Sequence, residues 1–230
     1  MSARHKFFLG LPVAALAVFL LVNLSQPAEA ETTQLKAPRA VVWKDFLGVN
    51  AHFLWFTPEQ YKQQMQRFHA LGLEWVRVDL HWDRHEPSEG RYRLGELDGV
   101  VDSLKQEQLK SVFYLVGSAP HATSAPSGSP TPDQFPPKQA QVFAERMAML
   151  ARRYPSIDAW QVWNEPNLPS FWRPHENAEA YGRLLQQSTQ ALRQVDPNKP
   201  VVMGGMAYYS QMPVKGGLML ESLGKLGVQQ

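Results

Sequence analysis

The chain has 230 residues, of which 44% are hydrophobic and 19% charged, and its formal net charge at pH 7 is +2. This composition is typical of a globular protein with a sizeable core. The nearly balanced charge argues against a nucleic-acid or polyanion partner. The sequence contains no cysteine, which excludes disulfides, thiolate nucleophiles and cysteine–zinc sites.

The first 30 residues have the composition of a targeting segment. Two basic residues precede an apolar run over residues 7–24, and the small-x-small sequence AEA ends at residue 30. This order predicts a secretory signal peptide that is cut after Ala30. The apolar run is long for a signal core, so an uncut membrane anchor through residues 7–24 is the alternative. In both cases we expect residues 31–230 to be periplasmic or secreted, and in the second case anchored to the inner membrane.

From residue 46 onward, strand patterns and helix patterns alternate. Apolar runs predict five strands, over residues 46–53, 73–82, 110–116, 158–163 and 200–207. Apolar residues at helical spacing follow each strand and predict five helices, over residues 58–71, 97–104, 143–154, 181–195 and 218–226. The first helix has a strong start signal, since Thr57 can cap it and Pro58 suits its first turn. Strands that alternate with helices predict right-handed βαβ units and a parallel sheet.

The residues after each strand indicate which parallel fold this is. No GxGxxG or GxxxxGK[ST] motif is present, which disfavours a nucleotide-binding open sheet. In a TIM barrel, the loops after the strands build the active site. Polar and aromatic residues follow four of the five predicted strands, and a 20-residue loop with six prolines, residues 118–137, follows the third. We therefore predict an α/β fold in which residues 31–230 form the N-terminal five βα units of a (β/α)8 TIM barrel, an incomplete barrel.

Aromatic faces and fixed polar groups at strand ends suit a carbohydrate, because a sugar ring presents C–H groups to an aromatic face and hydroxyls to polar side chains. The candidates for substrate binding are Asn50, His52, Arg77, His81, Trp82, Asn167 and Trp172. The alternative for any single aromatic residue is packing, since such residues also plug barrels and support loops. Other aromatic residues at these ends are Trp55, Phe56, Phe171, Tyr208 and Tyr209.

Glu165 is the candidate catalytic residue. It follows the near-apolar strand WQVW and precedes Pro166, so its carboxyl group is expected to be partly desolvated, which raises a carboxyl pKa. Glycoside hydrolysis needs such a group as the acid that protonates the leaving oxygen. Asn164 beside it can bond a sugar 2-hydroxyl. The alternative is a structural ion pair between Glu165 and Arg77 or Arg173.

The motif WNEPN at the end of a fourth strand resembles the acid/base signature of the clan A glycoside hydrolases. More narrowly, the chain resembles glycoside hydrolase family 39, and within it an endoglycosidase that acts on a secreted biofilm exopolysaccharide. The matching stretches are APRAVVWKDFLGVNAHFLWF, LGLEWVRVDLHWDR, LKSVFYLVGSA, DAWQVWNEPN and DPNKPVV. The resemblance implies a retaining mechanism, Glu165 as acid/base, Asn164 beside the substrate 2-hydroxyl, and Arg77 near the nucleophile. It implies a polysaccharide substrate and neither a metal nor an organic cofactor.

The chain departs from that family in one large respect. The family's nucleophile is a glutamate at the end of a seventh strand, and only five strands are predicted here. We therefore expect the 230-residue chain to be a fragment that is inactive in retaining hydrolysis. Asp79 and Asp83 are the only nearby alternatives for a second carboxylate, and nothing in the sequence marks either as a base. We also expect open sheet edges and a bare apolar inner face, and hence instability or self-association.

Two other functions compete with hydrolysis at the sequence level. His81 and His85 are four residues apart, as in zinc-binding HExxH helices, but this stretch leaves a strand and meets Pro87. A non-catalytic carbohydrate-binding protein, or an accessory protein of polysaccharide export, would keep the aromatic residues and the long loop without needing an acid.

Overall fold

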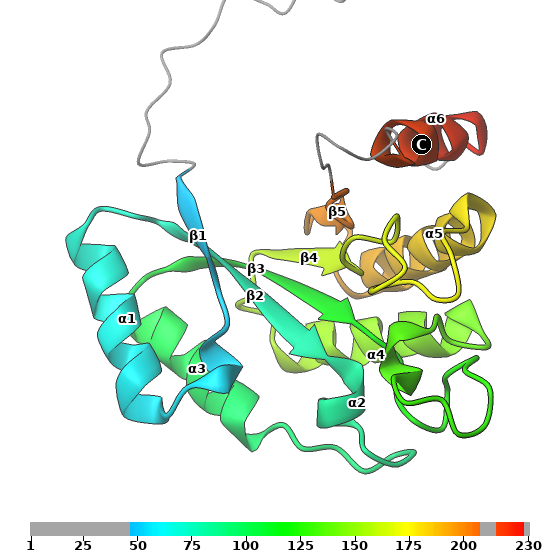
Figure 1. Cartoon of the computed structure of the whole chain (residues 1–230). Coiled ribbons are helices and arrows are strands. Elements are labelled where there is room, and N and C mark those ends of the chain that lie inside the picture. The colour runs from blue at the N-terminus through cyan, green and yellow to red at the C-terminus, as the bar shows by residue number, and fades with distance from the viewer. Residues whose placement is uncertain (1–46, 208–214, 228–230) are drawn as a thin grey trace, which may run out of the picture. The chain divides into compact units, whose positions relative to one another are not determined.

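Five parallel strands form one sheet in the order β1-β2-β3-β4-β5 in the computed structural model (Figure 1). The structure describes residues 47–207 and 215–227, which lie in one compact unit. The predicted signal or anchor segment, and Tyr208 and Tyr209, lie outside the described residues. The strands are β1 (Gly48–Ala51), β2 (Trp75–His81), β3 (Lys110–Val116), β4 (Ala159–Val162) and β5 (Val201–Met203).

A helix follows every strand, so the chain is a series of βα units. The longer helices are α1 (Pro58–Ala70), α3 (Gly95–Gln106), α4 (Ala140–Arg153), α5 (Ala178–Val195) and α6 (Lys215–Lys225). Shorter ones lie in the connections: η2 (Phe53–Trp55), α2 (Trp82–His85) and η3 (Pro132–Gln134). This confirms the predicted α/β fold, in which the described residues form the N-terminal five βα units of a TIM barrel.

Four strands end earlier than the sequence pattern predicts, the fourth by one residue, at Val162. The first stops at Ala51 because Phe53 turns into a 3-10 helix and is completely buried. The second stops at His81 because Trp82 begins α2 and turns its ring into the core. The fifth stops at Met203, where two glycines follow and the chain turns toward β4.

The two faces of the sheet have different chemistry. On β2, Val76, Val78 and Leu80 are at most 1% exposed and pack in the core with the helices. The alternate residues, Arg77 and Asp79, belong to the opposite face, as expected from the two-residue period of a strand. The inner face is therefore not bare apolar surface at Arg77 and its partners, which form a layer of hydrogen-bonded polar groups. At β5 the expectation holds, since Val202, in register with Gln161, is apolar and 40% exposed.

The two edges of the described sheet are open, as the sequence analysis expects. Val202 and Met203 of β5 are 40% and 37% exposed, and Leu47 before β1 is 41% exposed. Within residues 47–207 and 215–227, β1 and β5 each pair with one neighbour only. No helix in this part of the chain is long and apolar enough to cross a membrane.

Candidate active site

The turn after β4 has an unusual backbone. Trp163 and Glu165 have φ angles of 66° and 45°, the left-handed region that non-glycine residues rarely adopt. Hydrogen bonds hold the turn on both sides: the Trp163 N–H donates to the carbonyl of Leu115 (3.0 Å) and the Glu165 N–H to the carbonyl of Gly205 (2.9 Å). The neighbouring strands β3 and β5 thus fix the direction in which Glu165 leaves the sheet.

The Glu165 carboxyl group is half-buried, and among the described residues no side-chain hydrogen bond or ion pair engages it. Burial raises its pKa above the ordinary value, and the charge of Arg77 opposes that shift only in part. A carboxyl group with a raised pKa and a free oxygen can hold a proton and give it to a leaving group.

Arg77 organises the polar layer of the inner face. Its Nε donates to Gln161 Oε1 (2.9 Å), and its two terminal nitrogens donate to Asn50 Oδ1 (2.9 Å) and Asn164 Oδ1 (2.7 Å). The guanidinium lies over the Tyr114 ring, 3.9 Å from its centre. The structure thus brings together three predicted site residues, Asn50, Arg77 and Asn164, and orients the Asn164 amide beside Glu165.

The alternative of a structural ion pair for Glu165 is not supported. The three donor bonds of Arg77 go to amide oxygens rather than to the carboxylate. Arg173 donates its Nε to Gln134 Oε1 (2.7 Å) and so ties the loop after β4 to the loop after β3.

A second carboxyl group, Asp79, lies at the end of β2 and is 3% exposed. His52 Nδ1 is 2.9 Å from one of its oxygens, and His81 Nε2 is 3.2 Å from the other. Burial works to raise the pKa of Asp79, but the hydrogen bonds with His81 and His52 outweigh it and hold the pKa below its ordinary value. Asp79 is therefore an ionised group that orients two imidazoles.

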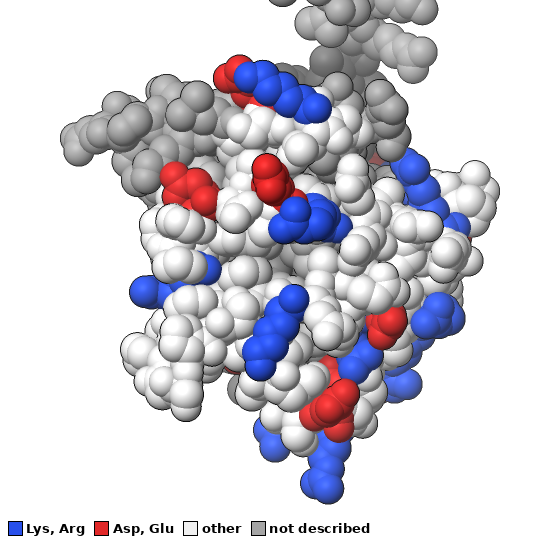
Figure 2. Space-filling model, turned by 90° about the vertical axis from the view of Figure 1, so that its right-hand side faces the viewer, with Lys and Arg blue, Asp and Glu red and all other residues white. Residues whose placement is uncertain are grey.

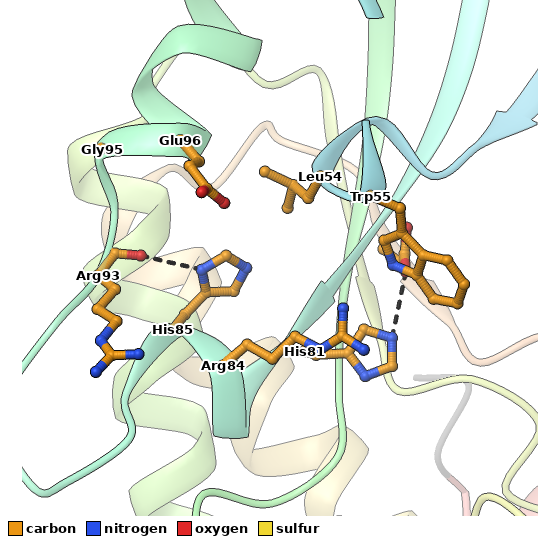
Figure 3. Close-up of a pocket in the computed structure, with 9 residues that line it drawn as sticks. Leu54, Trp55, His81, Arg84, His85, Arg93, Gly95 and Glu96 are labelled. Atoms are coloured by element: carbon orange, nitrogen blue, oxygen red, sulfur yellow. Dashed lines mark hydrogen bonds and ion pairs between the residues drawn. The ribbon is translucent and has the colours of Figure 1, made fainter. Parts of the chain in front are cut away.

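A cavity of about 440 Å³ opens beside these imidazoles (Figure 3). Its volume lies in the usual range for small-ligand pockets, about 300–1,000 Å³. In Figure 3, His85 and Glu96 lie on one side of it, and Trp55, Arg84 and His81 on the other. The cavity combines an aromatic face with hydrogen-bonding groups.

Trp55 is the aromatic residue of this cavity that the substrate-binding prediction left out. Its side chain is 57% exposed, and the rings of His52 and His81 lie 5.0 and 6.4 Å from it, centre to centre. The Arg84 guanidinium lies 5.4 Å from its centre. Its position after the first strand was visible in the sequence, but its exposure was not.

Three of the predicted substrate-binding residues are corrected by the structure. Trp82, Asn167 and Trp172 are 2%, 1% and 2% exposed, so none offers a surface to a ligand. Trp82 packs edge-on against Phe143, and Trp172 packs between Trp163 and Tyr181. The Asn167 amide bonds the backbone of Ala207 at both ends. Their role here is packing and backbone support.

Glu86 is a buried carboxylate that the sequence analysis did not single out. It is 1% exposed and accepts from Trp82 Nε1 (2.7 Å), Arg146 Nε (2.7 Å) and the Gly90 N–H (2.9 Å). Burial works to raise its pKa, but the bonds from Arg146 and Trp82 lower it below the ordinary value. Since these groups lie on the loop after β2 and on α4, Glu86 fixes that loop to the helix layer.

The remaining candidates of the sequence find no support. Burial raises the pKa of Asp83, and one of its oxygens is buried without a hydrogen bond in the described structure. His85 Nδ1 faces the Arg93 carbonyl (3.2 Å) while His81 faces Asp79, so the two histidines do not converge. Among residues 47–207 and 215–227, no group of three or more His, Cys, Asp or Glu could hold a metal ion.

Figure 2 shows the side of the molecule toward which β2, β3 and β4 point in Figure 1. Acidic and basic side chains are interspersed there among uncharged residues, and no large patch of one sign is visible in this view. A surface of this kind suits a ligand recognised by hydrogen bonds and apolar contacts more than by net charge.

Comparisons with known proteins agree with this fold. The chain is 27% identical over 129 residues to a beta-xylosidase of Geobacillus stearothermophilus, which covers 50% of this chain and 25% of that protein. The structure of the present chain is similar to that of a family 39 glycoside hydrolase of Bacteroides cellulosilyticus WH2, with a TM-score of 0.54 and 23% identity. The match covers 69% of this chain and 31% of that one. The present structure is also similar to that of a GH39 enzyme of Xanthomonas axonopodis pv. citri (TM-score 0.57, 20% identity, 79% and 38%).

The chain thus spans a quarter of the length of that curated relative and less than two fifths of each of these two structures. A family model, described as cellulase (glycosyl hydrolase family 5), matches residues 35–217 of the 230. The matched region contains every residue of the site built above. The chain belongs to this cellulase (glycosyl hydrolase family 5) family.

Proposed function

We propose that this protein is a retaining glycoside hydrolase of the family 39 type, in which Glu165 is the acid/base. The observation that carries the proposal is the placement of Glu165: half-buried, free of side-chain partners in the described structure, and beside an amide that Arg77 holds. A structural carboxylate in this chain, such as Glu86, is surrounded by donors instead.

In this mechanism Glu165 gives its proton to the glycosidic oxygen as the bond to the anomeric carbon breaks. It then takes a proton from the water that releases the product. Asn164 donates an N–H to the sugar 2-hydroxyl, since its oxygen already accepts from Arg77. Asn50, His52 and His81 line the same face as hydroxyl partners, and the exposed Trp55 ring offers an apolar face to a sugar.

The second carboxylate of a retaining enzyme must lie about 5–5.5 Å from the acid. Asp79 is engaged on both oxygens, and burial raises the pKa of the half-buried Asp83 and so disfavours its ionised, nucleophilic form. Neither is therefore a suitable nucleophile. We propose that the nucleophile lies on a further strand that would pair beyond β5, and that residues 1–230 alone do not perform retaining hydrolysis. The greater length of the relatives and the exposed side chains on β5 support this.

The test uses protein expressed from the whole gene, with sequencing beyond the codon for Gln230 as its first step. We expect Glu165→Gln to lower the release of reducing ends from a purified exopolysaccharide by about 10²–10⁴-fold. With 2,4-dinitrophenyl glycosides, the rate of glycosidic bond cleavage should fall far less, because the dinitrophenolate leaving group needs no proton from Glu165. Glu59→Gln, at an exposed glutamate of α1 that does not line the cavity, is the matched control. Unchanged turnover in Glu165→Gln would contradict the proposal.

For the substrate we propose a secreted exopolysaccharide cut internally, on the resemblance of the sequence to an exopolysaccharide endoglycosidase. The alternative remains a non-catalytic carbohydrate-binding or export accessory protein, which the exposed Trp55 would also suit. Wild-type protein that binds the polysaccharide through Trp55 but hydrolyses neither it nor aryl glycosides would establish that alternative.

We also propose that the protein acts outside the cytoplasm, in the periplasm or secreted. The composition of residues 1–30 supports this. Sequencing the N-terminus of the mature protein tests it: a start at Glu31 indicates a cleaved signal, and an intact N-terminus in the membrane fraction indicates an anchor.

A further inference from the structure

The backbone that carries Glu165 is joined to the segment after β5 at three points. The Gly204–Ala207 segment, which we term the β5 exit, runs beside the turn of residues 163–167. The Glu165 N–H donates to the Gly205 carbonyl (2.9 Å), in the middle of the contact. The two ends of the contact are held by side chains, Tyr181 and Asn167.

Tyr181 holds the end nearest the strands. It lies on α5, is completely buried, and donates its hydroxyl to the carbonyl of Val162, the last residue of β4 (3.0 Å). The same oxygen accepts from the Gly204 N–H (2.5 Å). One hydroxyl therefore satisfies a buried acceptor of β4 and a buried donor of the β5 exit, which would otherwise be unpaired.

The fit around this hydroxyl is close. A Cβ atom at Gly204 would lie 3.0 Å from the Tyr181 oxygen and 3.2 Å from both the Val162 oxygen and the Pro166 ring. Any other residue at this position would force these neighbours to shift by a few tenths of an ångström. At the other end, Asn167 donates to the Ala207 carbonyl (2.8 Å) and accepts from the Ala207 N–H (3.0 Å).

We propose that Tyr181 is a positioning residue for the acid/base Glu165, which it holds in place by fixing the β5 exit against the turn. This inference rests on the proposed function of Glu165. The left-handed φ of Trp163 and Glu165 stores strain, so the turn needs support from outside to keep that conformation. Tyr181 supplies it from the helix layer without contacting the substrate.

The experiment compares Tyr181→Phe with Tyr154→Phe in the protein from the whole gene. Both changes delete one hydrogen-bonded phenol hydroxyl from a buried ring, but Tyr154 bonds Asp98 on α3, away from the turn. The first readout is the pKa of the Glu165 carboxyl group, taken from ¹³C-glutamate NMR titrations with Glu165→Gln as the assignment control. The second is the division of the kinetic effect between kcat and KM on the exopolysaccharide.

We expect Tyr181→Phe to lower the Glu165 pKa toward its ordinary value, because the loosened turn lets water reach the carboxyl group. We expect kcat to fall about 10- to 100-fold with little change in KM. Tyr154→Phe should change neither, although it lowers the melting temperature. If both variants move the Glu165 pKa and kcat equally, or if neither does, Tyr181 has only a structural role and the inference is wrong.

Asn167→Ala is the second variant if Tyr181→Phe does not fold. A neutral change is needed there, because a new carboxylate two residues away would itself raise the Glu165 pKa. Asn167→Ala removes both bonds to the Ala207 backbone without adding a charge, and we expect a smaller shift in the same direction as for Tyr181→Phe. The NMR titration needs no turnover. A shift without any hydrolysis in the wild type would therefore refute the proposed function while leaving the positioning role standing.

Discussion

The ends of β2 and β4 each place one carboxyl group on the inner face of the sheet, and the two groups have opposite environments. Asp79 is 3% exposed, yet its pKa lies below the ordinary value because two histidines bond its oxygens. Glu165 is less buried, yet its pKa is raised because it has lost water and gained no donor. Partners, more than depth of burial, decide which of these groups is ionised.

This difference assigns the two groups different tasks. A carboxylate that stays ionised can orient imidazoles and cannot act as an acid at neutral pH. A carboxyl group with a raised pKa can donate a proton there. Pairs of carboxyl groups whose surroundings move their pKa values apart are a common mark of acid/base sites. Arg77 stands two residues before Asp79 on β2 and donates to Asn164 beside Glu165.

The largest effect that would test this comparison is expected from Arg77→Lys. Lysine keeps the charge but cannot donate to three amide oxygens in the plane that Arg77 uses, nor stack equally well on Tyr114. We expect a loss of about 2–4 kcal/mol in the free energy of unfolding, measured by urea denaturation. We also expect a loss of turnover of at least about 100-fold.

A matched control for this change is Arg183→Lys, an exposed arginine on α5 whose nearest carboxylate oxygen is 3.9 Å away. We expect it to be within about 0.5 kcal/mol of the wild type. If Arg77→Lys changes the free energy of unfolding and the turnover as little as Arg183→Lys does, the hydrogen bonds of Arg77 contribute neither to stability nor to the placement of Asn164 beside Glu165.

The second prediction concerns the pH dependence of stability. Asp79 has a lowered pKa, so it stabilises the folded state above its ordinary pKa of 3.8, and this contribution is lost as the pH falls through the folded-state pKa. Glu165 has a raised pKa, so its contribution is present below its ordinary value of 4.5 and is lost as the pH rises through the folded-state pKa. The two groups thus act with opposite sign at neutral pH.

We therefore expect Asp79→Asn to lower the melting temperature at pH 7 and Glu165→Gln to raise it slightly. The difference from wild type should narrow for Asp79→Asn as the pH is lowered below 3.8. Thermal melts of the three proteins between pH 3 and 8 measure this. A stabilised Asp79→Asn at pH 7 would show that burial outweighs the two histidines.

The third prediction tests the reassignment of Trp82 from substrate binding to structure. Trp82→Phe keeps most of the buried ring but removes the N–H that bonds Glu86. We expect a loss of about 1–3 kcal/mol in the free energy of unfolding, and no change in affinity for the polysaccharide. Weakened binding in a variant that remains folded would restore the original assignment.

The fold was predictable from the sequence because it rests on periodicity. Apolar residues at strand and helix spacing place five βα units, and WNEPN after β4 locates Glu165. The site was predictable in part, since Asn50, Arg77 and Asn164 do converge. The sequence did not predict which aromatic side chains face the core and which face solvent. Trp82 turns inward because α2 begins at that residue, while Trp55 stays exposed at the end of a 3-10 helix.

The same limit explains the other missed residues. Gln161 and Tyr114 lie within strands that read as continuously apolar, and only the strand register shows that they face Arg77. Glu86 follows a short helix and gives no sequence signal that it will be enclosed by Trp82 and Arg146. Long-range contacts of this kind depend on the closed packing of several loops, which a local pattern does not specify.

The smallest expected effect comes from Trp55, on the Asp79 side of the comparison. Its side chain is 57% exposed, so Trp55→Ala should change the free energy of unfolding by about 0.5 kcal/mol or less. If its ring stacks on a sugar, the same change should weaken polysaccharide binding by about 5- to 10-fold, measured by titration calorimetry. Phe56→Ala, at a neighbouring residue that is 44% exposed but does not line the cavity, is the control. If Trp55→Ala weakens binding no more than Phe56→Ala does, the Trp55 ring does not stack on the substrate and the cavity beside Asp79 is not its binding site.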